Sequence, residues 1–260
     1  MFSKMYYYFL YLRTYLIIKR KQLLNAVSLT RKNSYTPFVI LSEPRSGSTL
    51  LHTYLNSHTQ IKSYGEVLRE NLEERPDRTI KDPLNKLAFK PHTPALKAIG
   101  LKLFYEYYEH PLYAESFKNV IDRKDIKIIH LIRRDPLKVY TSLKIAQKTN
   151  VWSTLKSADA NRIQKIQIDC EDYTSFLKSY LKHQQLFSAM FTDHPLLEIA
   201  YEDLAKNPEQ TLYTVQEFLG VKPKKLFSLL KKQNPDSLQS LVVNYDEAVK
   251  LTHELYLSKL

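Results

Sequence analysis

A loop with one glycine, an arginine and several hydroxyls is the first part of this sequence that could do chemistry. In PRSGSTLL it follows strand-forming residues, precedes helix-forming ones, and contains Arg45, Ser46, Gly47, Ser48 and Thr49. Such a loop directs unpaired backbone N–H groups and a helix dipole at one point. Gly47 lets the backbone approach a ligand, and Arg45 can fork onto phosphate oxygens. The loop predicts a phosphate site, although a plain strand-to-helix turn with a serine N-cap has the same outline.

The loop lacks the features of a nucleoside triphosphatase. The pattern GxxxxGK[ST] is absent, so no lysine is placed to reach a γ-phosphate, and no pair of Mg²⁺ ligands follows. We therefore expect the loop to hold a single 5′-phosphate rather than a triphosphate chain.

A second polar cluster follows the isoleucine-rich segment DIKIIHLIRR at 125–134. Arg134 ends this segment, and Ser142 lies eight residues later in a stretch that begins with Asp-Pro, a typical helix start. An arginine fork and a hydroxyl suit a second phosphate, which carries about two negative charges and three acceptor oxygens. A salt bridge from Arg134 to Asp135 or to another surface carboxylate is the interpretation that needs no ligand.

Together these clusters resemble the signatures of the sulfotransferase superfamily, whose members use 3′-phosphoadenosine 5′-phosphosulfate (PAPS). PRSGSTLL is similar to the family loop that binds the 5′-phosphosulfate, and a strand ending in Arg-Asp, with a serine eight residues after the arginine, is similar to its 3′-phosphate motif. AYEDLAKNPEQTL (200–212) looks like the family's YEDL segment, and NPDSLQSLVVNYDEAV (234–249) resembles the C-terminal stretch of bacterial members. The resemblance spans about Pro37 to Leu251 in the family's order.

The resemblance implies a role for each cluster. Residues 45–49 would hold the 5′-phosphosulfate, Arg134 and Ser142 the 3′-phosphate, and Tyr201 would lie near the adenine. The implied enzyme transfers a sulfuryl group from PAPS to an acceptor hydroxyl and releases 3′-phosphoadenosine 5′-phosphate (PAP). We expect the acceptor to be a glycan or glycolipid, with peptide tyrosine or a small lipid as the alternative. We predict no metal, because the histidines show no ligand spacing such as HExxH.

The reaction needs a base for the acceptor hydroxyl, and positioning and electrostatics should dominate it. Glu66, about twenty residues after the loop, is the preferred candidate, because some family members use a glutamate in a similar Gly-Glu context. The alternative is that Glu66 has only a structural role, as a helix-capping or salt-bridged carboxylate. His52 and His58 are the other candidates near the loop, and His130, inside a predicted strand, is expected to be structural.

The reaction also needs a cation beside the transferred group. Lys102 stands alone among apolar strand residues, which is costly unless its amine reaches a polar site. The family has a lysine on a comparable strand, whereas Lys81, in a KDP context, is the rival. Gly47, Gly65 and Gly100 each lie beside an assigned site residue, as expected where a backbone approaches a ligand.

The elements that must position these residues alternate between strands and helices. This alternation predicts an α/β fold: a single domain with a central parallel sheet flanked by helices and a P-loop-like nucleotide-binding core. In such sheets, ligands bind beyond the carboxyl ends of the strands, where three polar clusters would meet: Glu43–Thr49, Arg133–Asp135 and Tyr201–Asp203. Strands are expected at 36–42, within 95–105, at 125–134 and at the start of 195–204; helices are expected at 48–57, 135–148, 171–191 and 208–220.

Composition adds the expected partners. The 260 residues carry 39 Lys and Arg against 27 Asp and Glu, a net charge of +12, which favours anionic partners. We divide the chain into an amphipathic helical segment (1–34) and a sulfotransferase domain (35–260). The N-terminal segment could associate with a membrane surface, so we expect a cytoplasmic protein that can lie at the membrane. The single cysteine, Cys170, has no activating context.

Two functions outside the family remain as alternatives. A nucleotide kinase-like enzyme would require Mg²⁺-dependent ATP turnover, which the missing Walker lysine argues against. A non-catalytic binder of nucleic acid or anionic membrane would show steep salt dependence, but we expect no nucleic acid as a partner. The acceptor pocket is expected from residues 64–95 and 149–170, where Trp152 could stack on a sugar ring or lie in the core.

Overall fold

The computed structural model describes residues 2–73, 80–152, 165–230 and 237–257, with side chains from residue 6 to residue 256. Its centre is a five-stranded sheet in the order β2-β3-β1-β4-β5, and every neighbouring pair is parallel. The fold class expected from the sequence is therefore confirmed. The strands are β1 (Thr36–Ser42), β2 (Ile61–Ser63), β3 (Ala98–Phe104), β4 (Lys127–Ile132) and β5 (Leu196–Ala200).

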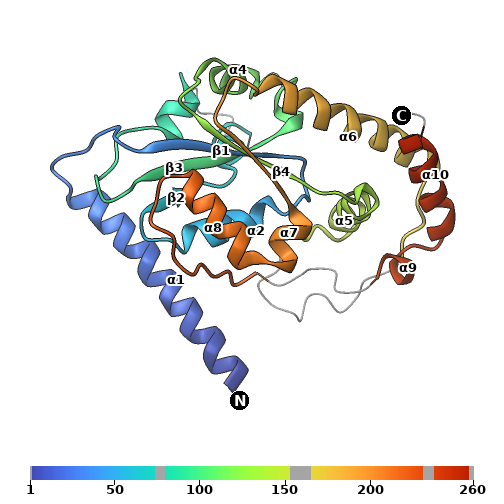
Figure 1. Cartoon of the computed structure of the whole chain (residues 1–260), viewed down its shortest axis with the longest axis horizontal. Coiled ribbons are helices and arrows are strands. Elements are labelled where there is room, and N and C mark those ends of the chain that lie inside the picture. Colours follow the sequence, from blue (N-terminus) through green and yellow to red (C-terminus); the bar gives the residue numbers. More distant parts are fainter. Residues whose placement is uncertain (1, 74–79, 153–164, 231–236, 258–260) are drawn as a thin grey trace.

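Helices cover both faces of this sheet, and α1 extends away from it (Figure 1). A π-helical turn (η1, Leu84–Ala88) and a 3₁₀ turn (η2, Tyr105–Tyr107) complete the described elements. The helices are α1 (Phe2–Val27), α2 (Ser48–Asn56), α3 (Val67–Leu72), α4 (Ala114–Asp122), α5 (Pro136–Thr149), α6 (Cys170–Met190), α7 (Tyr201–Lys206), α8 (Pro208–Phe218), α9 (Leu238–Leu241) and α10 (Tyr245–Leu257).

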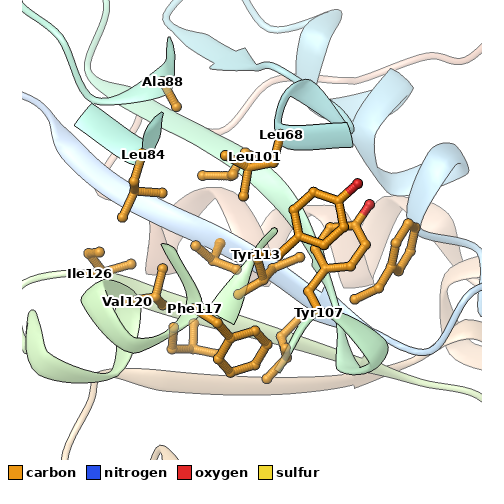
Figure 2. Packing of buried hydrophobic residues seen from close by; sticks show 14 of the residues in the cluster. Leu68, Leu84, Ala88, Leu101, Tyr107, Tyr113, Phe117, Val120 and Ile126 are labelled. Atoms are coloured by element: carbon orange, nitrogen blue, oxygen red, sulfur yellow. The ribbon is translucent and has the colours of Figure 1, made fainter. Parts of the chain in front are cut away.

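The alternating side chains of β1 divide the core into two layers. Phe38 and Ile40 face α2 and α8, whereas Val39 and Leu41 face the layer formed by α3, η1, α4 and α6. Figure 2 shows this second layer, where Tyr107 and Tyr113 from neighbouring segments stack with ring centroids 4.2 Å apart. Because both faces of β1 are covered, its sequence is a continuous apolar run rather than an alternating one.

Most of the expected elements are present. The strand 36–42 is confirmed as β1, and the predicted helices 48–57, 135–148, 171–191 and 208–220 correspond to α2, α5, α6 and α8 within two residues at each end. The edge strand β2 was not predicted, because three residues carry no readable periodicity. Among the described residues, no helix has the length and apolar character needed to cross a membrane.

Candidate active site

A cleft of about 1050 Å³ opens at the carboxyl ends of the strands. The loop after β1, the ends of β3 and β4 and the start of α7 contribute to its lining, together with α3 and α5. The polar clusters that the sequence places after separate strands therefore meet at one edge of the sheet. Of the five loop residues, Arg45, Gly47, Ser48 and Thr49 line this cleft. Ser46 is buried and does not line it.

The loop after β1 is held in a left-handed backbone conformation at two positions. Arg45 has φ 67° and Gly47 has φ 92°, and α2 begins at the next residue, Ser48. Gly47 is the N-cap residue and no side chain caps the helix, so the plain serine-capped turn is not what forms here. A Cβ at Gly47 would lie 2.4 Å from Cδ2 of Tyr201, so this glycine accommodates the Tyr201 ring. The first N–H groups of α2 are thus left to face the cleft.

Lys102 and Glu66 form an ion pair beside this loop. Lys102 Nζ lies 2.7 Å from Glu66 Oε1 and donates to Thr49 Oγ1 at 3.0 Å. Arg69 binds the other carboxylate oxygen, with Nη2 2.8 Å from Oε2. Burial lowers the pKa of Lys102, and the Glu66 carboxylate opposes that shift. The cation candidate, the base candidate and the loop predicted to bind phosphate (residues 45–49, the phosphate loop) are therefore in direct contact.

The edge strand β2 explains how Glu66 reaches Lys102. The chain after β2 continues alongside β3, where the Tyr64 N–H donates to Gly100 O and the Lys102 N–H donates to Gly65 O, each at 2.8 Å. Gly65 has φ 68°, which turns the chain into α3 directly after Glu66. This short pairing therefore brings the backbone of Glu66 beside the buried amine of Lys102.

The histidine candidates lie in different surroundings. His52 lines the cleft, and its Nδ1 is 2.7 Å from Ser63 Oγ. Burial, with a smaller contribution from Lys102, lowers the pKa of His52 to about 4. His58 and His130 are buried and do not line the cleft; the His130 ring contacts the hydroxyl of Tyr105. The structural role expected for His130 agrees with this position.

The phosphate loop also contacts the second cluster directly. Arg45 Nε donates to Ser142 Oγ at 3.1 Å, across 97 residues of sequence, and Arg45 Nη1 donates to the carbonyl of Trp152 at 2.5 Å. Burial, followed by the nearby charge of Arg133, lowers the pKa of Arg45. Trp152 itself is 45% exposed and lines the cleft, so it is not a core residue.

The structure does not bring Arg134 into the cleft. Its guanidinium forks onto the Asp203 carboxylate with Nη1–Oδ1 3.0 Å and Nη2–Oδ2 2.7 Å, on the exposed surface. The neighbouring Arg133 lines the cleft instead: its Nη1 donates to Arg45 O at 2.9 Å and its guanidinium lies 4.5 Å from the Tyr201 ring centroid. Asp203 rather than Asp135 is therefore the salt-bridge partner of Arg134 in this structure.

Other candidates from the sequence lie elsewhere. Lys81 is exposed and does not line the cleft, so Lys102 is the lysine that meets Glu66. Cys170 begins α6, where burial raises its pKa, and does not line the cleft either. Gly100 accommodates the Phe38 ring, 2.5 Å from the place a Cβ would take. The described residues contain no group of three or more His, Cys, Asp or Glu that could hold a metal ion.

Several residues of the cleft were assigned no individual role from the sequence. Arg69 could have been found, because it lies three residues after Glu66 on one helical turn. Arg133 is adjacent to Arg134, but no feature of the sequence indicated that Arg133 would line the cleft. The carboxylates of Glu43 and Glu106 also line the cleft, and burial, with a smaller contribution from Glu43, raises the pKa of Glu106. Their approach depends on the fold rather than on spacing.

Comparisons with known proteins identify the family of this chain. The sulfotransferase domain family matches residues 35–255. Nodulation protein H of Rhizobium tropici is 31% identical over 222 residues, covering 81% of this chain and 87% of the relative. Nodulation protein H of Rhizobium meliloti (strain 1021) is 27% identical over 225 residues, which cover 81% of this chain and 89% of the relative. A solved sulfotransferase structure from Alicyclobacillus acidocaldarius is 17% identical with a TM-score of 0.48, and the match covers 87% of this chain and 96% of that one. The family match spans most of the chain, which therefore belongs to the sulfotransferase family and is an enzyme of that class.

Proposed function

We propose that this sulfotransferase transfers a sulfuryl group from PAPS to a hydroxyl of a carbohydrate or glycolipid, with Glu66 as the base. The observation that carries the proposal is the contact of Glu66, Lys102 and Thr49 at the phosphate loop. It brings a proton acceptor, a cation and the phosphate-binding backbone to one point of the cleft. General-base catalysis with electrostatic stabilisation of the leaving group requires this combination.

The cleft residues fit an anionic nucleotide of this kind. Thr141 and Arg133 line the cleft, and Thr141 Oγ1 and Arg133 Nε are buried with no hydrogen-bond partner among the described residues, which is unusual for buried polar atoms. The start of α2 adds backbone N–H groups, and Lys102 adds positive charge. When bound, PAPS supplies the sulfuryl group and a nucleotide phosphate as the leaving group.

The side chains around Glu66 divide the work of the transfer. Glu66 would take the proton of the acceptor hydroxyl as the new sulfur–oxygen bond forms and the bond between sulfur and the 5′-phosphate oxygen of PAPS breaks. Lys102 and Arg69 hold one carboxylate oxygen each, which fixes the orientation of the base. Lys102 and the α2 N–H groups stabilise the negative charge that develops on the leaving phosphate. His52 stays neutral above about pH 4 and adds no competing charge.

The proposal keeps Arg134 and Ser142 as the holders of the 3′-phosphate and Tyr201 as the neighbour of the adenine. Arg134 must then exchange Asp203 for the phosphate. This exchange is inexpensive, because both partners of the ion pair are more than half exposed and such pairs contribute little. Arg133 would have a different role, since it positions Tyr201 and the loop backbone through the contacts it already makes.

The lining of the cleft favours a neutral, hydroxyl-rich acceptor. Glu43, Glu70 and Glu106 line the cleft, as does Trp152, which is exposed. Carboxylates accept hydrogen bonds from sugar hydroxyls and repel acceptors that are already anionic, and an aromatic ring offers a face for stacking. These features favour a glycan or glycolipid over a tyrosine that lies in an acidic peptide segment.

Transfer from labelled PAPS to a panel of neutral oligosaccharides, glycolipids and tyrosine peptides tests the proposal. We expect product with a glycan or glycolipid, and a loss of at least a hundredfold in kcat for Glu66→Gln with PAP affinity unchanged. Glu109→Gln is the control, because Glu109 is exposed and does not line the cleft. A fully active Glu66→Gln would move the base to His52. Sulfated tyrosine peptides alone would favour the alternative acceptor, and Mg²⁺-dependent ATP turnover would favour a kinase.

A further inference from the structure

Helix α1 carries apolar residues on two opposite sides. One side packs toward the domain, and the other is an outer stripe formed by Tyr8, Phe9, Leu12, Tyr15, Leu16, Leu23 and Val27, which share a face by helical periodicity. Tyr8 is 70% exposed and Leu23 is 62% exposed, with the rest between 48% and 62%. Nothing in the described part of the chain covers this stripe, and α1 reaches away from the domain in Figure 1.

The second half of α1 is fixed to the domain, and this attachment sets the direction in which the outer stripe faces. Lys21 is 6% exposed, and its Nζ donates to the carbonyls of Asn56 at 2.8 Å and Ile61 at 2.5 Å. Asn25 Oδ1 accepts a hydrogen bond from the Thr93 N–H at 3.1 Å. A loosely attached tail would have none of these contacts. The stripe therefore behaves as a surface of the folded protein.

The charge around the stripe identifies its partner. No Asp or Glu occurs before Glu43, whereas seven Lys or Arg do. Lys19 and Arg20 are exposed beside the stripe, and Lys19 Nζ lies 5.6 Å from the centroid of the Tyr15 ring. A second copy of α1 would place like charges together, which argues against self-association. Tyrosine, leucine and basic side chains mixed on one face suit the boundary between lipid headgroups and acyl chains, where the basic groups meet anionic lipid.

We propose that the outer stripe of α1 docks on an anionic lipid bilayer, with the apolar side chains at the acyl boundary and Lys19 and Arg20 at the headgroups. The helix lies on the membrane and does not cross it, in accord with its interrupting basic residues and its fixed inner side. The docking proposal does not depend on the proposed sulfuryl transfer, so a failure of one would leave the other intact.

Flotation of the full chain with lipid vesicles tests the docking. We expect binding to phosphatidylcholine vesicles with about one third phosphatidylglycerol and little binding to pure phosphatidylcholine. The double variant Phe9→Ser/Leu12→Ser should weaken binding at least tenfold, and Lys19→Gln/Arg20→Gln should also weaken it. Leu112→Ser is the matched control, because Leu112 is 50% exposed outside α1. An unchanged melting temperature in each variant shows that the fold is intact.

Three outcomes would overturn the proposal. The first is a wild-type chain that does not float with anionic vesicles. The second is a Phe9→Ser/Leu12→Ser variant that binds as tightly as the wild type, which would reduce the interaction to the general attraction of a basic protein for an anionic surface. The third is a dimer, seen by sedimentation without lipid, that Phe9→Ser/Leu12→Ser dissociates, which would make the stripe a contact between two copies.

Discussion

Lys102 is the side chain on which the proposed chemistry depends most directly. It is 3% exposed, and its amine contacts both the base candidate and the phosphate loop. Replacement by methionine keeps the approximate length of the side chain and removes the charge. Removing one partner of a buried ion pair is destabilising, so the melting temperature should fall, but Glu66 keeps its ion pair with Arg69 and the fold should survive.

We predict that Lys102→Met lowers kcat at least a hundredfold, because the leaving phosphate loses its nearest buried cation. Lys81→Met is the control, since Lys81 is exposed outside the cleft and should retain full activity. Steady-state kinetics with a melting curve for each variant make the comparison. Equal losses in the two variants would contradict the assignment of the cation to Lys102.

Single residues also show where prediction from the sequence stops. Lys102 was predictable, because a lysine inside an apolar strand is costly unless a polar site receives it. Its partner Glu66 came from resemblance, since the contact depends on the pairing of β2 with β3. The conformation of Arg134 was not predictable: Asp203 lies 69 residues away, and only the fold places the two side chains in reach.

At the scale of the elements, the phosphate loop and α7 fit together through Gly47. A Cβ there would lie 2.4 Å from the Tyr201 ring at a left-handed φ of 92°. Gly220 also has a left-handed backbone, with φ 72°, but no atom lies within 4 Å of the place a Cβ would take. An alanine at Gly220 would therefore strain the backbone without clashing with another residue. The two glycines therefore form a matched pair that separates backbone strain from the fit between elements.

We predict that Gly220→Ala lowers the free energy of unfolding by about 1 kcal/mol, the usual cost of a left-handed alanine. Gly47→Ala should cost more and should also abolish PAP binding, because Tyr201 and the loop must separate. Urea unfolding and calorimetric titration with PAP measure both effects. Intact PAP binding in Gly47→Ala would contradict the close fit between the loop and α7.

The elements differ in how far the sequence predicts them. β1, α2, α5, α6 and α8 were predicted nearly to their bounds, because apolar runs, an Asp-Pro start and a glycine stop mark them locally. β2 was not predicted, because its three residues owe their conformation to β3. The glycines beside the site were interpreted as making room for a ligand, whereas Gly47, Gly65 and Gly100 face the rings of Tyr201, His52 and Phe38.

At the scale of the whole molecule, buried histidines make stability depend on pH. Burial lowers the pKa of His52 and of His92 to about 4, from an ordinary value of 6.5. Between pH 6.5 and 4, the unfolded chain therefore binds more protons at these residues than the folded chain does. Stability is lost as the pH falls through this window and is fully present above it.

We predict that His52→Gln reduces this acid loss of stability by up to roughly 3 kcal/mol, since glutamine removes the titration while keeping a polar side chain near Ser63. His253→Gln is the control, because His253 is exposed. Urea unfolding at pH 7 and pH 4.5 compares the variants. An identical pH dependence of wild type and His52→Gln would show that His52 is not held neutral in the folded protein.

The central claim is that the cleft binds a nucleotide with phosphates at both the 5′ and 3′ positions. Calorimetric titration with PAP and with 5′-AMP tests this claim most directly. We predict that the wild type binds PAP at least tenfold more tightly than AMP, that Arg134→Ala removes this preference, and that Arg133→Ala weakens both ligands alike, since Arg133 supports the loop and Tyr201. Equal affinity of the wild type for PAP and AMP would contradict the account.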